Sequence, residues 1–373
     1  MASHRRNRRR PPGTLLIPLS IWLGISVIVA VVALAVALQK APAPPQAALA
    51  QGSGAFSLTA LHQRLPEDAK GQVQRYIDYF RNNRRRGFSD SLARSTRYVE
   101  RFKEIFREKG LPEELAFLPL IESGFVETAV SPAKAVGVWQ FIEETGRRYN
   151  LERNPWFDRR RDPILSAKAA ASYLAHLYEE FEDWDLALAA YNSGAGTVRW
   201  AQRVNRRTGD PTHYWSLDLP DETRNYVPAF IASVLIAKNP AAYGFDKIDF
   251  HPEMAYEVVK VSPGTSLALL EVQLDLKERT LFNLNAELTR GVVPPGDVPY
   301  ALRVPPGYGQ RIAAKLAGVE TQLNNWMLHH VQYQDTVQSL ARRFRARPAT
   351  IKAINRLQDN GELLQRRFVI IPL

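Results

Sequence analysis

The chain has 373 residues, which is too many for one compact core and enough for two or three domains. It carries 49 Lys and Arg against 38 Asp and Glu, a net charge of +11, and 45% of its residues are hydrophobic. This composition is typical of a globular protein and excludes wholesale disorder. The sequence contains no Cys, which excludes disulfides, thiolate nucleophiles, Cys-ligated metals and Cys-linked lipids. The excess positive charge suits three partners: nucleic acid, an anionic membrane surface or an anionic polymer.

The N-terminal part predicts a membrane anchor. Residues 1–14 hold five Arg, and residues 15–38 follow without a charged side chain. As a helix, the second segment would span ~36 Å, against ~30 Å for the hydrocarbon core of a bilayer. The positive-inside rule keeps the basic tail 1–14 in the cytoplasm and exports the rest of the chain, so nucleic acid is not expected as a partner. The alternative is a signal peptide cleaved near Ala35-Val36-Ala37.

The next two segments predict a linker and an all-helical domain. Residues 39–55 are rich in Pro, Gly and Ala, which favours an extended, flexible tether. In the domain, residues 56–245, apolar side chains recur on one helical face from Val73 to Phe80 and from Tyr98 to Phe106. Gly110 ends the second of these helices, and Pro and Glu open another after it. Further helices are expected at about 139–149, 166–182, 185–192 and 222–237.

Glu122 stands at the end of an apolar stretch that begins at Leu115. Apolar surroundings raise the pKa of a carboxyl group and keep it protonated near neutral pH, which is what a general acid needs. The alternative is an exposed residue at the end of a helix. The other acids of this region have polar or basic neighbours and are expected at the surface: Glu127, Glu143, Glu144, Asp158 and Asp162.

Three blocks of sequence carry a resemblance to a known family. The first joins ESGF at Glu122, Ser131, GVWQF and TGR; the second is AYNSG at residues 190–194; the third is ETRNYV at residues 222–227. Together they resemble the signature of lytic transglycosylases, and the span is most similar to the membrane-bound murein type D. The resemblance implies a goose-lysozyme-like helical domain with a groove for a glycan strand. Departures such as Gly124, where the family usually has Ala, remove no matched functional position.

The resemblance implies a mechanism that needs one acid. Glu122 would protonate the oxygen of the β-1,4 bond between N-acetylmuramic acid and N-acetylglucosamine, and then deprotonate the sugar's C6 hydroxyl. That oxygen would close onto C1 and give a 1,6-anhydro end, without water, metal or cofactor. By motif position, the other site residues would bind sugar, line the groove or orient the reacting groups: Ser131, Gln140, Tyr191, Asn192, Glu222 and Tyr226.

Other interpretations of some of these residues stay open at this point. Asn192 would otherwise cap the turn at Ser193, Glu222 would be a helix first-turn acid, and Trp139 is expected in the core rather than as a stacking platform. The Arg clusters of this domain suit either a basic groove rim, facing the carboxylates of peptidoglycan, or solvated helix faces: Arg84 to Arg86, Arg147, Arg148, and Arg159 to Arg161.

The C-terminal part contains an internal repeat. At an offset of 70 residues, Ser266 corresponds to Thr336 and Asn285 to Asn355, and near the ends the offset falls to 67. Each unit is predicted as strand, helix, helix, strand, or βααβ. The second unit, residues 326–373, resembles a LysM domain, a class that binds glycans containing N-acetylglucosamine. Residues 250–306 are expected to be a degenerate LysM-like unit, and residues 307–325 a linker helix.

The sequence thus predicts a mainly α protein with small α+β units at its C-terminus and one transmembrane helix. It is expected to be a lytic murein transglycosylase in a bacterial inner membrane, with its catalytic domain in the periplasm. Its expected partners are peptidoglycan glycan strands, the membrane through residues 15–38, and unidentified cell-wall synthesis or division proteins. The alternatives are a lysozyme-type muramidase, which hydrolyses the same bond, and a catalytically idle peptidoglycan-binding scaffold.

Overall fold

The computed structural model describes Leu65 and residues 67–314, 326–355, 357–358, 363–364 and 368–372. The predicted tail, anchor and linker, residues 1–55, lie outside these residues. Of the predicted linker helix only residues 307–314 are described, and 309–314 are helical. Within the described ranges, no helix has the length and apolar character needed to cross a bilayer.

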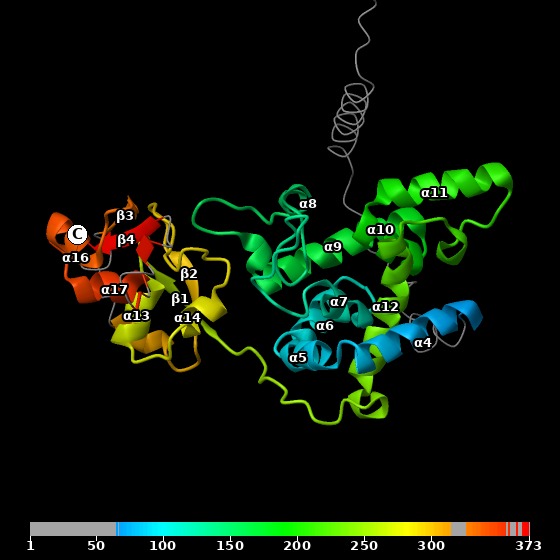
Figure 1. The fold of residues 1–373 in the computed structure, drawn as a ribbon, viewed down its shortest axis with the longest axis horizontal. Coiled ribbons are helices and arrows are strands. Elements are labelled where there is room, and N and C mark those ends of the chain that lie inside the picture. The colour runs from blue at the N-terminus through cyan, green and yellow to red at the C-terminus, as the bar shows by residue number, and fades with distance from the viewer. Residues whose placement is uncertain are drawn as a thin grey trace, which may run out of the picture. The chain divides into compact units, whose positions relative to one another are not determined.

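A helical domain occupies residues 67–245 (Figure 1). Helices α9, α10 and α12 confirm the predicted segments at 166–182, 185–192 and 222–237. Helices α5 and α11 were not predicted. The α-helices of the domain are α4 (Glu67–Asn82), α5 (Arg85–Ser95), α6 (Val99–Glu108), α7 (Pro119–Glu122), α8 (Glu143–Arg148), α9 (Pro163–Phe181), α10 (Trp184–Ser193), α11 (Ala195–Thr208) and α12 (Asp221–Lys238).

Two predicted helices are shorter than expected. The segment after Gly110 is a 3₁₀ turn, Glu113–Phe117, followed by the single turn of α7. Pro119 explains the break, because it has no N–H to bond the carbonyl of Leu115. The helix predicted over 139–149 is confined to α8, since Gln140 has a left-handed backbone with φ of 50°.

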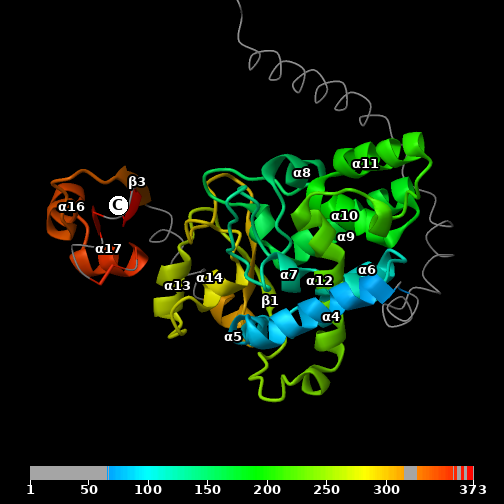
Figure 2. The same cartoon turned by 45° about the vertical axis from the view of Figure 1, so that its right-hand side comes forward.

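The core of the domain lies between α4, α6, α9, α10 and α12. Helix α12 packs against α4 and α10, and α4 and α12 lie side by side in both cartoon views (Figures 1 and 2). Trp139 is fully buried, with its ring centroid 5.2 Å from that of Phe102 and 5.5 Å from that of Phe106. The expectation that Trp139 is a core residue is therefore confirmed.

Two βααβ units follow, as predicted from the repeat. In each unit the two strands form an antiparallel pair. The first consists of β1 (Glu257–Val261), α13 (Leu267–Gln273), α14 (Thr280–Leu284) and β2 (Tyr300–Val304); the second of β3 (Trp326–His330), α16 (Val337–Phe344), α17 (Pro348–Asn355) and β4 (Phe368–Pro372).

The repeat offsets reappear in the hydrogen bonds of the two units. Asn285 accepts from the Arg303 amide and donates to the Arg303 carbonyl, at 2.9 and 2.8 Å. Asn355 makes the same pair of bonds with Ile370, both at 2.6 Å. In both units the Asn side chain thus adds two hydrogen bonds between the end of the second helix and the closing strand. The two copies are built on one plan.

Two acids predicted at the surface are buried. Asp158 is 8% exposed and forms an ion pair at 2.7 Å with Arg160, which is itself 3% exposed. Asp162 is 2% exposed, caps the first turn of α9 and pairs with Arg303 of β2. The Arg residues beside them in sequence favour a place in solvent, but in the fold an Arg accompanies each carboxylate into the interior, so the prediction was wrong.

Candidate active site

Glu122 is held at a sharp reversal of the chain. It ends the short helix α7, and Gly124 and Phe125 after it both have a left-handed backbone with φ of 61°. Arg94 of α5 donates to the Gly124 carbonyl at 2.7 Å, and Ser123 donates to the Val138 carbonyl at 2.8 Å. The Glu-Ser-Gly-Phe block is therefore a fixed corner that presents Glu122 from the end of a helix.

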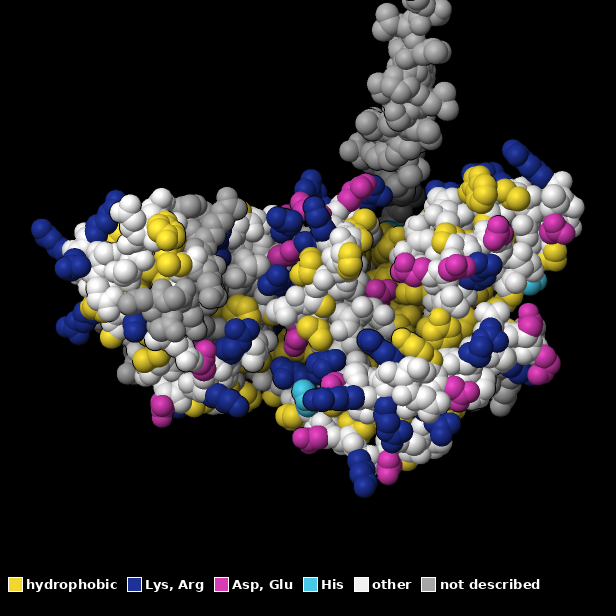
Figure 3. Space-filling model, viewed as in Figure 1, with side chains coloured by type: hydrophobic (Ala, Val, Ile, Leu, Met, Phe, Trp, Pro, Cys, Tyr) yellow, Lys and Arg dark blue, Asp and Glu magenta, His cyan; other side chains and the backbone are white. Residues whose placement is uncertain are grey.

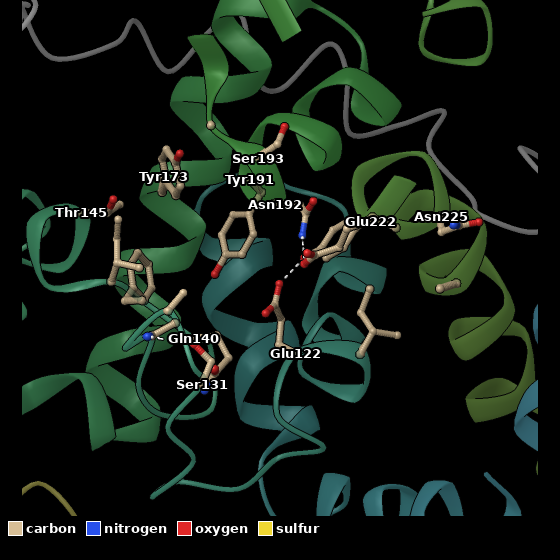
Figure 4. Close-up of a pocket in the computed structure, with 18 of the residues that line it drawn as sticks. Glu122, Ser131, Gln140, Thr145, Tyr173, Tyr191, Asn192, Ser193, Glu222 and Asn225 are labelled. Atoms are coloured by element: carbon tan, nitrogen blue, oxygen red, sulfur yellow. Dashed lines mark hydrogen bonds between the residues drawn. The ribbon is translucent and has the colours of Figure 1, made fainter. Parts of the chain in front are cut away.

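The carboxyl group of Glu122 is partly buried and points into a pocket (Figure 4). The Tyr226 hydroxyl of α12 donates to its Oε1. Burial raises the pKa of Glu122 to about 7; the Tyr226 hydrogen bond acts against this rise, and the negative charge of Glu222 adds to it. Near neutral pH, Glu122 is therefore poised between a proton donor and a proton acceptor, which fits the expectation for a general acid.

A loop opposite Glu122 carries Ser131 and Gln140. The Gln140 side chain donates to the Gly137 carbonyl at 2.8 Å, and Ser131 Oγ accepts from the Ala135 amide at 3.1 Å. The buried Arg160 holds this loop from behind, because its guanidinium donates to the Phe141 carbonyl at 3.1 Å. Both predicted site residues thus belong to one braced loop.

Helices α10 and α12 supply the remaining site residues. From α10, Tyr191 donates to the Trp139 carbonyl at 2.8 Å. The Asn192 amide nitrogen donates to Glu222 at 3.2 Å, and its oxygen accepts from the Thr223 hydroxyl at 2.8 Å. The Asn192 side chain therefore bridges two helices and does not cap the turn at Ser193. Glu222 lies in the first turn of α12 and is also one of the two groups that Asn192 bonds.

Tyr214 holds α12 where its hydrogen-bond ladder is interrupted. Pro228 stands inside α12 and has no N–H for the Arg224 carbonyl one turn earlier. The hydroxyl of Tyr214 donates to that carbonyl at 2.8 Å and lies 2.9 Å from the Thr223 carbonyl. The adjacent Trp215 donates to Asp185 of α10 at 2.8 Å. The loop before α12 thus fixes the helix turn that bears Glu222 and Tyr226.

Replacing Tyr214 with Phe is expected to lower the free energy of unfolding by about 1–3 kcal/mol, because the part-buried Arg224 carbonyl then loses its donor. Urea unfolding, followed by Trp fluorescence, measures the change. Tyr79→Phe is the matched control, since this ring is half exposed and should change stability by less than about 0.5 kcal/mol. Equal effects of the two substitutions would contradict this role of Tyr214.

The site residues line an open groove. Glu122 lies where two adjoining hollows of about 680 and 730 Å³ meet, and both also include Ser131 and Gln140. Figure 3 shows this face hollowed above α7 and α12, with hydrophobic side chains in the hollow. The first hollow contains all seven residues predicted for the site: Glu122, Ser131, Gln140, Tyr191, Asn192, Glu222 and Tyr226.

The Arg clusters take different positions. Arg84 lines the second hollow together with Arg94, and basic side chains gather over α5 in Figure 3. Arg147 and Arg148 form exposed ion pairs with acids of their own helix, as expected for a solvated face. Arg160 fits neither interpretation, because it is buried and braces the groove loop.

The structure brings all seven predicted residues together, although their individual roles remain predictions. It also adds residues that the sequence analysis did not single out. Tyr173 and Asn225 line the same hollow, and Thr223 supports it from behind. Thr223 belongs to the ETRNYV block, so that motif was the one available signal for it.

The helical domain, with Glu122 at the floor of an open groove, has the fold and the site of an enzyme of the lytic transglycosylase class. Residues 102–213 match the family described as Transglycosylase SLT domain. The chain is 31% identical over 319 residues to the membrane-bound lytic murein transglycosylase D of Escherichia coli strain K12, a match that covers 82% of this chain and 70% of that protein. The chain belongs to the family of membrane-bound lytic murein transglycosylase D.

Two solved structures share a more distant likeness. An inactive mutant of the lytic transglycosylase Slt from Pseudomonas aeruginosa has a TM-score of 0.31 at 23% identity, over 40% of this chain and 24% of that chain. The 70 kDa soluble lytic transglycosylase of Escherichia coli has a TM-score of 0.32 at 22% identity, over 42% and 27%. Each match spans about a quarter of the solved chain, and the family assignment rests on the sequence matches.

Proposed function

We propose that this lytic murein transglycosylase cleaves the β-1,4 bond between N-acetylmuramic acid and N-acetylglucosamine without water, with Glu122 acting first as acid and then as base. The observation that carries the proposal is the Glu122 carboxyl group, partly buried at the floor of the groove and held by Tyr226. Its pKa of about 7 allows both protonation states at neutral pH.

In the first step, protonated Glu122 gives its proton to the glycosidic oxygen as the bond to C1 breaks. The positive charge that develops at C1 is stabilised by the sugar's own N-acetyl group. In the second step, the Glu122 carboxylate takes the proton of the C6 hydroxyl, and that oxygen closes onto C1. The attacking oxygen belongs to the same sugar, so its effective concentration is very high and no second carboxylate has to activate water.

The acids that line the two hollows support the single-acid mechanism. Besides Glu122 they are Glu222 and Asp90. Glu222 accepts a hydrogen bond from the Asn192 amide, which suits it to bind a sugar hydroxyl rather than to activate water. Ser131 and Gln140 would bind sugar from the facing loop. Tyr191 would orient the acetamido group, and Tyr226 orients Glu122.

Analysis of the products tests the reaction type. The full chain in detergent is incubated with peptidoglycan sacculi, and the soluble fragments are examined by mass spectrometry. The expected muramoyl ends are 1,6-anhydro ends, which are one water lighter than reducing ends. Reducing ends would instead assign a muramidase, and binding without any soluble product would assign a scaffold.

Replacing Tyr226 with Phe is expected to move the high-pH limb of the activity profile to still higher pH. The Tyr226 hydrogen bond lowers the pKa of Glu122, so its removal raises that pKa. Because the first step needs the protonated acid, activity falls as pH rises through this pKa. The initial rate of anhydro-product release, measured from pH 5 to 9, gives the limb, and an unchanged limb would contradict the coupling.

We further propose that the second βααβ unit is a LysM domain that binds N-acetylglucosamine in peptidoglycan. Its βααβ order is the one expected for the LysM domain that the sequence resembles. Tyr333, in the turn between β3 and α16, is 92% exposed. Chitin, which lacks the muramic acid of the cleavage site, separates this binding from that of the groove. Tyr333→Ala is expected to reduce retention on insoluble chitin, with Phe250→Ala as control; unchanged retention would leave the unit a spacer.

The finer location is a proposal as well. The Escherichia coli relative is membrane-bound by name, which favours a place in the cell envelope for this chain. We propose that residues 15–38 hold the chain in the inner membrane with the catalytic domain in the periplasm. Fractionation of cells that express the chain, followed by protease treatment of spheroplasts, tests this topology. Recovery in the soluble cytoplasmic fraction would overturn it.

A further inference from the structure

We propose that Thr223 is a positioning residue for the transglycosylase reaction: its buried hydroxyl fixes the Asn192 amide so that Asn192 and Glu222 face the groove as one pre-arranged sugar-binding pair. The proposal rests on the proposed function of the groove. Thr223 does not line either hollow and is 1% exposed, so it acts through Asn192 and has no contact of its own with a glycan.

The two hydrogen bonds of the Asn192 amide are complementary. Its oxygen accepts from Thr223 Oγ1 at 2.8 Å, while its nitrogen donates to Glu222 Oε1 at 3.2 Å. A carboxylate only accepts, so the opposite amide orientation would set two oxygens against each other. Glu222 therefore selects which end of the amide faces it, and Thr223 supplies the donor that the other end requires.

The use of the Thr223 hydroxyl is unusual for a helical Thr. Such hydroxyls commonly bond a carbonyl of the preceding turn of their own helix, as Thr208 of α11 does with the Asn205 carbonyl at 3.0 Å. Thr223 instead bonds a side chain of another helix, 31 residues earlier in the chain. The bond joins the end of α10 to the first turn of α12, one turn before Tyr226, which holds Glu122.

Without the hydroxyl, the Asn192 oxygen would lose its donor and the amide could rotate away from Glu222. The carboxylate of Glu222 would then also lose a partner, and the sugar would have to order both side chains on binding. Preorganisation of this kind lowers the free-energy cost of ordering the two side chains, both when the substrate binds and in the transition state. Its loss is therefore expected mainly as a lower kcat/KM. The Glu122–Tyr226 pair does not touch the hydroxyl, so the pH profile should stay in place.

Thr223→Val removes the hydroxyl at nearly constant shape, and Thr223→Ser keeps it. We expect Val to lower kcat/KM for anhydro-product release by about tenfold, the value of one buried hydrogen bond, and Ser to stay within about twofold of wild type. Thr208→Val is the control, because this hydroxyl bonds within α11 and Thr208 lines neither hollow, and it should leave kcat/KM unchanged. The activities are normalised to the folded fraction from circular dichroism.

A double-mutant cycle with Asn192→Ala separates positioning from a merely structural role. If Thr223 acts through Asn192, Thr223→Val should have no further effect on kcat/KM in the Asn192→Ala chain. Equal losses in both backgrounds, or equal losses for Val and Ser, would overturn the proposal. Thr223→Ala replaces Val in the cycle if the Val variant does not fold.

The same comparison is made in the Glu122→Gln chain by sedimentation with peptidoglycan sacculi. This readout needs no turnover, so it distinguishes failure of this inference from failure of the proposed reaction. Thr223→Val should weaken sedimentation there by a similar factor, and Thr223→Ser should not. Unchanged sedimentation of the Val variant would contradict the positioning of the sugar-binding pair.

Discussion

Glu122→Gln is expected to abolish the release of 1,6-anhydro fragments, with a loss of at least about a thousandfold, while binding to peptidoglycan persists. A general acid contributes about 10²–10⁴ to the rate, and here the same group is also the base of the second step. Gln has the same size and retains an oxygen for the Tyr226 hydroxyl, so the groove should keep its shape. Mass spectrometry of the soluble products and sedimentation with sacculi give the two readouts.

The control for this variant is Glu144→Gln. Glu144 is an exposed acid of α8 that pairs with Arg148 and does not line either hollow. Its replacement should leave both product release and sedimentation as in wild type. Full activity of the Glu122→Gln chain would refute the acid–base assignment, and loss of binding together with activity would point to a damaged groove rather than to lost chemistry.

Apolar periodicity predicted those helices whose buried faces are apolar. Val73 and Phe80 mark α4 in this way, and the predicted bounds of α9, α10 and α12 are within a few residues of the observed ones. Helix α11 escaped because its buried face includes Gln202 and Asn205, which bond carbonyls of the following loop. Buried polar side chains are recognisable only once their partners are known, and those partners are tertiary.

The site was predicted from family motifs rather than from spacing. Glu122 and Tyr226 are 104 residues apart, and no helical or strand period links positions so distant. The same limit hid the burial of Asp162, whose partner Arg303 lies 141 residues further along the chain. Motifs indicate which residues meet, but not which second layer supports them. For that reason the supporting roles of Thr223 and Tyr214 emerged only from the hydrogen bonds.

Gly137→Ala is expected to destabilise the protein by about 3–5 kcal/mol and to remove activity with it. Gly137 has a φ of 87°, and a Cβ on it would lie 1.9 Å from the backbone oxygen of Arg160. That oxygen cannot move aside easily, because the Arg160 side chain is fixed by Asp158 and by the Phe141 carbonyl. The loop that bears Gln140 would therefore have to shift instead. Urea unfolding, followed by Trp fluorescence, measures the loss.

Gly194→Ala separates the clash from the backbone strain. Gly194 has a nearly equal φ of 84°, but nothing lies within 4 Å of the Cβ position. Only the backbone conformation, with φ of 84° and ψ of 142°, then opposes the side chain, with a cost of about 1–3 kcal/mol. If both variants lose the same stability, close packing of Gly137 on Arg160 does not fix the groove loop. A clearly larger loss for Gly137→Ala would show that Arg160, although remote from the groove, sets the position of the loop that faces Glu122.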